Sequence, residues 1–190
     1  MVFAFVITTL QPGFVKLLYS TTFDRDDSLT DRQDRKEVLQ RVCQKVASEY
    51  DAMKRYTNRN DAGDFERLRS DNVLPEFSRG IVRLEPEEFF ADGKMILWFA
   101  AIDTGFALIL ENSENVHVAT LNLKLLIQNL QQYTQVMTEP VVALARVERI
   151  VMVVERSIPN GVLPLHTSAL LKERLKETDK SFSRLIKEKG

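Results

Sequence analysis

Two short hydrophobic runs open the chain, and a turn sequence separates them. The first run, Met1–Leu10 (MVFAFVITTL), is rich in β-branched and aromatic residues, and it ends at Gln11–Gly13 (QPG). The second run, Phe14–Phe23 (FVKLLYSTTF), follows closely enough to form an antiparallel hairpin with it. The first run lacks the basic residues and cleavage site of a signal peptide, and it is too short to cross a membrane as a helix. We therefore expect two strands, with the fold starting at residue 1.

A long helix is predicted next. Asp24–Asp31 is an acidic, turn-rich connection, and Thr30 with Gln33 matches a capping box at a helix N-terminus. Apolar residues then recur every three or four positions, which indicates one buried helix face. They are Val38, Leu39, Val42, Cys43, Val46, Ala47, Tyr50 and Met53. Because Cys43 lies in this stripe, the pattern favours a small core residue over a reactive thiol.

The middle of the chain combines a polar segment with further strands. Asn58–Ser78 is charged and has no clear period, so we expect a long surface loop there. Three apolar runs follow it, namely Arg79–Leu84, Met95–Ile102 and Phe106–Leu110. The second of these runs is apolar on both faces, so helices should cover the sheet on both sides. Together with the first two strands, these runs predict a sheet of five strands.

Helical spacing returns in the last third of the chain. A second helix is predicted from Thr120, with Leu123, Leu126, Ile127, Leu130 and Tyr133 on its apolar face. A third is predicted from Glu139-Pro140, because proline is tolerated in the first helical turn. Its expected apolar stripe is Val141, Leu144, Val147, Val151 and Val154. A charged helix is expected from about Thr167 onward.

This order of elements predicts an α/β (α+β) fold, with a five-stranded antiparallel sheet sandwiched between helices. The long first helix can cover one face of the sheet, and the two later helices can cover the other. We expect one domain over residues 1–175, which includes the 58–78 surface loop, and a C-terminal helical tail over 176–190.

Charge and cysteine content narrow the possible partners and the compartment. Lys and Arg number 26 against 27 Asp and Glu, so the net charge of −1 provides no long-range attraction for nucleic acid or anionic lipid. Cys43 is the only cysteine, and the chain has no Asn-x-Ser/Thr acceptor. An intramolecular disulfide is therefore impossible, and a cytoplasmic location is expected rather than secretion.

The sequence provides little that could support catalysis or a cofactor. Its two histidines, His117 and His166, lie far apart, and no His or Cys stands near either of them at metal-ligand spacing. Each is expected at the surface. Neither glycine-rich phosphate-binding motif occurs, which excludes the usual kinase and NTPase sites. We therefore predict no catalytic residue, no metal and no cofactor.

One short segment offers an enzymatic alternative. Ala101–Gly105 (AIDTG) resembles the Asp-Thr-Gly motif of aspartic proteases, in which two aspartates share a proton and activate water. This chain has one copy, so Asp103 would need a symmetric homodimer, and Phe106 stands where those proteases have a small residue. Asp and Gly also suit a tight hairpin turn. The turn is the favoured interpretation, and the protease is the distant alternative.

Several stretches carry a resemblance to a known family. They are MVFAFVITTL, LLYSTTF, RKEVLQRVCQKV, TGFALILENSEN, LNLKLLIQNL and RVERIVMVVERSIPNG. In their number and order they are similar to the longin-like small (sigma) subunits of adaptor-protein coat complexes, and among these to the branch of the fifth adaptor complex. The similarity extends from Met1 to about Leu175 and is weakest in the 58–78 segment and the C-terminal tail.

This resemblance implies a non-enzymatic subunit of a cytoplasmic heterotetramer. Its partners would be a large zeta subunit, on which the sigma subunit packs, and the beta and mu subunits. The implied role is clathrin-independent endosomal protein transport at late endosomes and lysosomes, alongside spatacsin and spastizin. Membrane association would be peripheral and through the complex only. A longin-like regulatory subunit of another trafficking assembly is the alternative.

Sigma subunits of some sister complexes also contribute to a pocket for dileucine sorting signals. The corresponding stretch here lies near Ile127 and Gln128. A shift of one residue in the alignment exchanges the apolar side chain for the polar one, which would line such a pocket badly. The sequence therefore assigns no cargo-binding or partner-binding residues.

Overall fold

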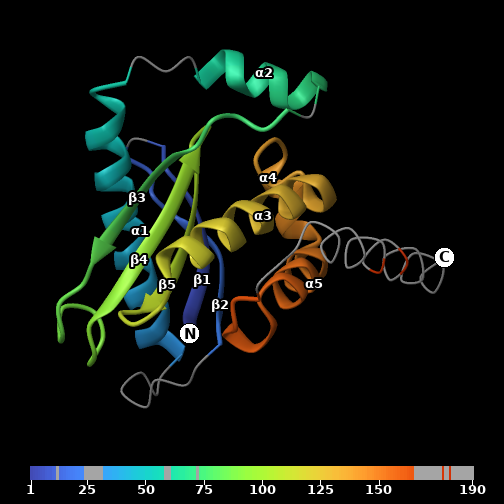
Figure 1. Cartoon of the computed structure of the whole chain (residues 1–190). Helices are drawn as coiled ribbons and strands as arrows, with labels where there is room; N and C mark the ends of the chain where they lie inside the picture. The colour runs from blue at the N-terminus through green and yellow to red at the C-terminus, as the bar shows by residue number, and fades with distance from the viewer. Residues whose placement is uncertain are drawn as a thin grey trace.

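The computed structural model describes residues 1–11, 13–23, 32–57, 61–71 and 73–164, together with 177 and 180. Strands and helices alternate in blocks along this part of the chain (Figure 1). In chain order the elements are β1 (Val2–Thr9), β2 (Leu17–Thr22), α1 (Arg32–Lys54), α2 (Asp61–Asp71), β3 (Ser78–Arg83), β4 (Lys94–Ala101), β5 (Thr104–Glu111), α3 (Val116–Thr134), α4 (Pro140–Ala145), α5 (Val147–Ser157) and the 3₁₀ turn η1 (Pro159–Gly161).

The five strands form one antiparallel sheet in the order β2-β1-β5-β4-β3. The chain therefore enters the sheet near one edge, crosses to the other edge with β3, and returns to the centre with β5. The central strand β5 pairs with β1 on one side and with β4 on the other. The predicted five-stranded antiparallel sheet between helices is confirmed.

Two separate hydrophobic cores lie on the two faces of the sheet, because successive side chains of a strand point to opposite faces. In β1, for example, Ala4 and Val6 face α1, whereas Phe5 and Ile7 face α3 and α5. The predicted apolar stripe of α1 fills the core on the α1 side of the sheet, except that Val38 is only partly buried and Met53 is exposed. The expectation that helices cover both faces is confirmed, and Figure 1 shows α1 on the opposite side of the sheet from α3 and α5.

The side chain of Gln40 in α1 forms hydrogen bonds to the backbone at the start of the edge strand β2. Gln40 of α1 accepts a hydrogen bond from the Leu17 amide at 3.0 Å, and its side-chain nitrogen donates to the Val15 carbonyl at 2.9 Å. Val15 and Leu17 present these groups away from β1, because the intervening Lys16 carbonyl accepts from Thr9 of β1. The side-chain amide of Gln40 therefore forms the hydrogen bonds that the backbone of a neighbouring strand would form at this place.

The segment Asn58–Ser78 is not a loop throughout, and this prediction was wrong for its middle. Residues Asp61–Asp71 form α2, whose Leu68 is 2% exposed and belongs to the core on the α3 side. A helix of 11 residues that buries essentially one apolar side chain has too few apolar positions to show a period. In Figure 1, α2 lies across the end of the sheet.

Two boundaries of the C-terminal helices also differ from the prediction. The second predicted helix begins at Val116 rather than near Thr120, because Asn115 caps it. The third is broken at Arg146, whose φ of −120° and ψ of 48° are not helical. The break separates α4 from α5 and changes the register of the predicted stripe, so that Val141, Val147 and Val151 are exposed. Ala143, Ile150 and Val153 are buried instead, together with Val154.

Several predictions fall on parts of the chain that the structure does not describe. They concern Thr30 of the capping box, His166 and most of the expected C-terminal helix. The division into a 1–175 domain and a 176–190 tail stays a prediction for the same reason. Among the helices within the described ranges, none is both long enough and apolar enough to cross a bilayer.

Candidate interaction surface

Asp103, the candidate protease residue, lies in the tight turn between β4 and β5. Ile102 and Asp103 have φ of 49° and 57°, and the flanking Ala101 and Thr104 pair directly, which defines a two-residue hairpin loop of the left-handed kind. The Asp103 carbonyl accepts a hydrogen bond from the Leu10 amide at 2.7 Å, and its carboxylate is 4.0 Å from the Lys54 ammonium. A tight hairpin turn in this segment is confirmed, but its two loop residues are Ile102 and Asp103, whereas Thr104 and Gly105, which were expected in the turn, lie in β5.

Cys43 of α1 is fully buried in the core between this helix and the sheet, as its position in the apolar stripe predicted. Burial raises the pKa of its thiol to about 11, with smaller opposing contributions from hydrogen bonds that include the Thr8 side chain. At neutral pH the thiol is therefore protonated. A thiol that is both protonated and inaccessible is a poor nucleophile and a poor metal ligand, so Cys43 is a core residue.

The remaining candidate chemistry does not converge on one place. His117 is exposed in the first turn of α3, as predicted, whereas His166 lies outside the described residues. Within the ranges that the structure describes, His, Cys, Asp and Glu side chains form no group of three that could hold a metal ion.

The stretch near Ile127 and Gln128 is now placed on α3. Ile127 is fully buried in the core between α3 and the sheet, while Gln128 is only partly buried. The side chain of Ile127 therefore packs α3 against the sheet. No cargo-binding residue follows from these positions.

The outer face of α4 and α5 is unusually apolar. Four valines are exposed there: Val141 by 79%, Val142 by 43%, Val147 by 44% and Val151 by 41%. We call these four residues the valine surface. Ile150, Val153 and Val154 of α5 are buried against the rest of the protein, and Val147 and Val151 lie at the exposed edge of this same apolar face. The apolar face of α5 is therefore wider than the rest of the protein covers, which is typical of an element that also contacts a partner.

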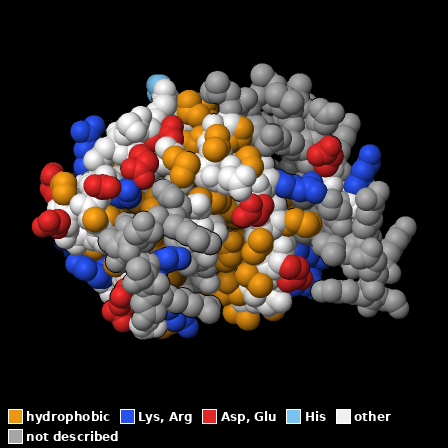
Figure 2. All heavy atoms as spheres, turned by 90° about the horizontal axis from the view of Figure 1, so that it is seen from below, with side chains coloured by type: hydrophobic (Ala, Val, Ile, Leu, Met, Phe, Trp, Pro, Cys, Tyr) orange, Lys and Arg blue, Asp and Glu red, His pale blue; other side chains and the backbone are white. Residues whose placement is uncertain are grey.

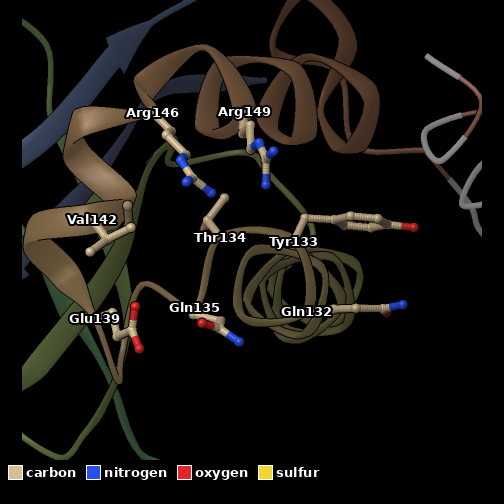
Figure 3. A pocket seen from close by; sticks show the side chains of 9 residues that line it. Gln132, Tyr133, Thr134, Gln135, Glu139, Val142, Arg146 and Arg149 are labelled. Atoms are coloured by element: carbon tan, nitrogen blue, oxygen red, sulfur yellow. The ribbon is translucent and has the colours of Figure 1, made fainter. Parts of the chain in front are cut away.

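A cavity of about 350 Å³ borders this surface, between the end of α3 and the start of α5. Figure 3 shows the side chains of Arg146 and Arg149 pointing into the space beside Thr134, where α3 ends. We call this cavity the arginine pocket. Among the described residues that line it, Glu139 is the only acidic one, and Val142 of the valine surface lines it as well.

The wall of the arginine pocket is held by the connection between α3 and α4. Gln135 ends α3 with a φ of 54°, and its amide donates to the Gln131 carbonyl at 3.0 Å. The buried side chain of Gln131 in turn accepts from the Met137 amide at 3.0 Å. Because Gln135 and Met137 of this connection are both hydrogen-bonded to Gln131 of α3, these contacts fix the wall of the pocket.

A second cavity, of about 450 Å³, lies on the α2 side of the same connection. Phe65, Leu68 and Arg69 of α2 form one wall, and Gln131, Gln135, Thr138 and Glu139 form the other. Gln135 and Glu139 are shared by the two cavities. The connection between α3 and α4 is therefore hollowed on both sides.

Exposed hydrophobic side chains also occur elsewhere on the molecule. Figure 2 shows the molecule from below, where hydrophobic side chains are visible between acidic and basic ones. Outside the valine surface, the exposed examples come from different elements and connections: Met1, Phe14, Met53, Tyr56, Val73, Ile81, Leu121 and Val162. The valine surface differs from these in gathering four apolar side chains on two consecutive short helices.

Comparison with known proteins identifies the family. The family described as AP-5 complex subunit sigma-1 matches residues 1–178 of the chain. The chain belongs to this family. The human AP-5 complex subunit sigma-1 is 30% identical to it over 180 residues, which cover 86% of this chain and 90% of the human protein. The mouse AP-5 complex subunit sigma-1 is 27% identical over 157 residues, which cover 74% of this chain and 92% of the mouse protein.

Membership of the AP-5 sigma family establishes the general role. Adaptor sigma subunits are structural components of trafficking complexes and are not enzymes, so this chain is a small subunit of an adaptor complex. The protease alternative at Asp103 is therefore set aside on two independent grounds, the family and the hairpin turn. The resemblance noted from the sequence is confirmed at the level of the family.

The sequence did not predict the exposed residues of the valine surface. The prediction assigned Val141, Val147 and Val151 to a buried stripe, and the structure exposes all three. The composition of Val141–Val154 did indicate exposed apolar residues, because this segment contains more apolar positions than one helix face can bury. The arginine pocket had no sequence signal, because it depends on the break at Arg146.

Proposed function

We propose that this chain is the sigma subunit of a heterotetrameric adaptor complex, in which it packs on the large zeta subunit and stabilises the core. The beta and mu subunits complete the assembly. The observation that carries the proposal is the family match over residues 1–178, which extends through the whole described fold. The valine surface supports it, because exposed apolar side chains on two neighbouring helices gain stability when a partner covers them.

The cellular role proposed for the complex is clathrin-independent transport of proteins through endosomes. By resemblance to its family, the subunit works in the cytoplasm and on the membranes of late endosomes and lysosomes, alongside spatacsin and spastizin. It would reach these membranes only through the complex. The net charge of −1 supports this indirect route, since it gives the subunit no general attraction for anionic lipid.

Affinity purification tests the proposal directly. The chain is expressed in cells with a tag after Gly190, and the proteins that copurify with it are identified by mass spectrometry. We expect zeta, beta and mu subunits in comparable amounts, with spatacsin and spastizin present at lower levels. Recovery of a different assembly without adaptor subunits would contradict the proposal and support a longin-like regulatory subunit of another trafficking complex.

Imaging tests the cellular location separately. The tagged chain should overlap with late-endosome and lysosome markers, and this overlap should vanish when the zeta subunit is depleted. A signal that stays on these membranes without zeta would contradict peripheral binding through the complex.

A further inference from the structure

The two edges of the sheet differ in how much of their backbone is already hydrogen-bonded. At the β2 edge, the side chain of Gln40 occupies the Leu17 amide and the Val15 carbonyl. The strand β3 forms the other edge, because among the described strands it pairs with β4 alone (Figure 1). The β3 side is therefore the edge at which a further strand can pair with the backbone.

Three residues of β3 present their backbone groups to this edge. The Leu84 amide, just after β3, donates to the Lys94 carbonyl of β4 at 2.8 Å. Successive residues of an antiparallel strand face opposite neighbours, and the register of β3 on β4 has no shift. The amides and carbonyls of Arg79, Ile81 and Arg83 therefore point away from β4. Within the described part of the chain, these groups have no hydrogen-bond partner. We call these three residues the β3 edge.

The side chains of the β3 edge lie beyond the cover of the helices. They stand directly opposite three β4 residues of the core on the α3 side, namely Met95, Leu97 and Phe99, and so they share that side of the sheet. The β4 side chains are at most 3% exposed, whereas the residues of the β3 edge are all exposed, Ile81 by 48%. The helices on this side therefore cover β4 but leave β3 uncovered.

The exposed row consists of two arginines with an isoleucine between them. Neither Arg79 nor Arg83 forms an ion pair or a side-chain hydrogen bond with any residue that the structure describes. Side chains directly opposite each other on neighbouring antiparallel strands interact, and opposite charges in such a pair attract. A neighbouring strand would therefore pair best if it placed carboxylates opposite the arginines and an apolar side chain opposite Ile81.

We propose that the β3 edge binds an extended acidic segment of a partner protein as a sixth, antiparallel strand of the sheet. The segment carries carboxylates on both sides of an apolar residue, at alternate positions along the strand. Backbone hydrogen bonds to the β3 edge provide affinity, and the two arginines provide the preference for acidic segments. This inference goes beyond the proposed function and does not depend on it, because the site needs only this chain and the segment.

The same charges disfavour a second copy of this chain as the added strand. If two β3 strands paired antiparallel around Ile81, Arg79 of each copy would lie opposite Arg83 of the other. Like charges directly opposite each other destabilise a strand pair. An acidic segment replaces both repulsive pairs by attractive ones, and it also covers the exposed isoleucine.

Peptide binding to the full chain tests the proposal. The probe is the end-blocked peptide Thr-Glu-Thr-Val-Thr-Glu-Thr, whose glutamates and valine share one face of a strand. Calorimetric titration measures its affinity, and NMR of the labelled chain shows which amides shift. We expect a Kd below about 1 mM at low salt, weaker binding at high salt, and the largest shifts at the amides of the β3 edge. The peptide with lysine in place of both glutamates should bind about tenfold more weakly or less.

Paired charge reversals test the two arginines. The combined change Arg79→Glu and Arg83→Glu should weaken binding about tenfold or more, because two attractive pairs become repulsive. The matched control combines Arg55→Glu, just after α1, with Arg146→Glu, at the break between α4 and α5. Both control positions are exposed, and the net charge changes equally. The control should leave binding within about twofold of the unchanged chain.

A separate variant tests the backbone. Ile81→Pro removes an amide that points outward, and proline is tolerated on an edge strand where its nitrogen faces solvent. This variant should abolish binding, whereas Ile81→Val should weaken it by less than about threefold. Thermal unfolding shows whether Ile81→Pro folds. If it does not, the peptide provides the same test. Methylating the valine nitrogen, which faces β3, should weaken binding about tenfold or more, and methylating that of a neighbouring threonine, which faces away, should have little effect.

Several results would overturn the inference. They are no binding at about 1 mM peptide, binding that the reversal of Arg79 and Arg83 leaves unchanged, and equal effects of the two methylations. Dimerisation of the chain that Ile81→Pro abolishes would identify a second copy as the occupant and would also overturn it. Failure to copurify adaptor subunits contradicts only the proposed function, because peptide binding requires no other subunit.

Discussion

At the scale of single residues, Cys43 connects burial to the pH dependence of stability. An exposed cysteine thiol has a pKa of 9.0. Burial between α1 and the sheet raises the pKa of the Cys43 thiol to about 11. The unfolded chain therefore releases this proton at a lower pH than the folded chain does. As a result, the stability contributed by the neutral thiol is fully present below about pH 9 and is lost as the pH rises toward 11.

We predict that the free energy of unfolding falls between pH 9 and pH 11, and that Cys43→Ala removes part of this fall. The Cys43 contribution can reach about 1.4 kcal/mol per pH unit in that window. Urea unfolding of both proteins at several pH values between 8 and 10.5 measures the difference. Tyr19, whose pKa burial also raises, is present in both proteins and cancels. Parallel curves for the two proteins would show that Cys43 does not titrate as expected.

At the scale of elements, the ends of helices were harder to predict than their faces. The apolar stripe of α1 predicted both that the helix exists and which of its faces is buried, because the apolar residues from Leu39 to Tyr50 recur with a helical period. The start of α3 at Val116 was missed, since the signal is the single residue Asn115 and the first turn carries exposed His117. The break at Arg146 was missed for a different reason, because no proline or glycine marks it.

We predict that Asn115→Ala destabilises the protein by about 1 kcal/mol. The Asn115 side-chain oxygen accepts hydrogen bonds from the His117 and Val118 amides at 3.0 and 3.2 Å, and alanine leaves both amides without this partner. Asn115→Ser should retain most of the stability, since serine is also a good cap. Ser113→Ala, in the exposed turn just before the cap, is the matched control and should change the midpoint of urea unfolding very little. Equal losses in the alanine variants of Asn115 and Ser113 would argue against capping.

At the scale of the whole molecule, the sequence predicted the layers but not the interaction surface. The three-layer arrangement was predictable because the run of β4 is apolar on both faces and so must be covered on both sides of the sheet. The amphipathic helices provide that cover. The valine surface and the two cavities depend on how α2, α4 and the end of α3 are placed relative to one another. Short polar helices such as α2 carry almost no sequence signal for that placement.

The two ends of the described fold meet at Gly161, which has a φ of 76°. A Cβ atom there would lie 2.7 Å from the Val2 carbonyl oxygen of β1 and 2.7 Å from the Cβ atom of Phe23. The turn η1 thus lies against the start of β1 and the end of β2. Only glycine allows both the backbone angle and this close approach.

We predict that Gly161→Ala destabilises the protein by roughly 2 to 4 kcal/mol, through backbone strain and displaced neighbours. Gly13→Ala is the matched control, because Gly13 has a nearly identical φ of 75° but nothing within 4 Å of the added atom. That variant should cost only about 1 kcal/mol. Thermal unfolding of both variants measures the contrast. Similar losses in the two would mean that the contacts of η1 with β1 and β2 contribute little.

The hydrogen bonds of Gln40 have a consequence for a sigma subunit that has not yet met its partners. An edge strand with unpaired backbone groups is a template on which a second chain can add a strand, and repeated addition leads to aggregation. Along this part of the edge, the Leu17 amide and the Val15 carbonyl are already occupied by the glutamine side chain. A strand from another copy would find no donor or acceptor there. The side chain of Gln40 thus limits self-association at this part of the edge, because it occupies the backbone groups that a sixth strand would bind.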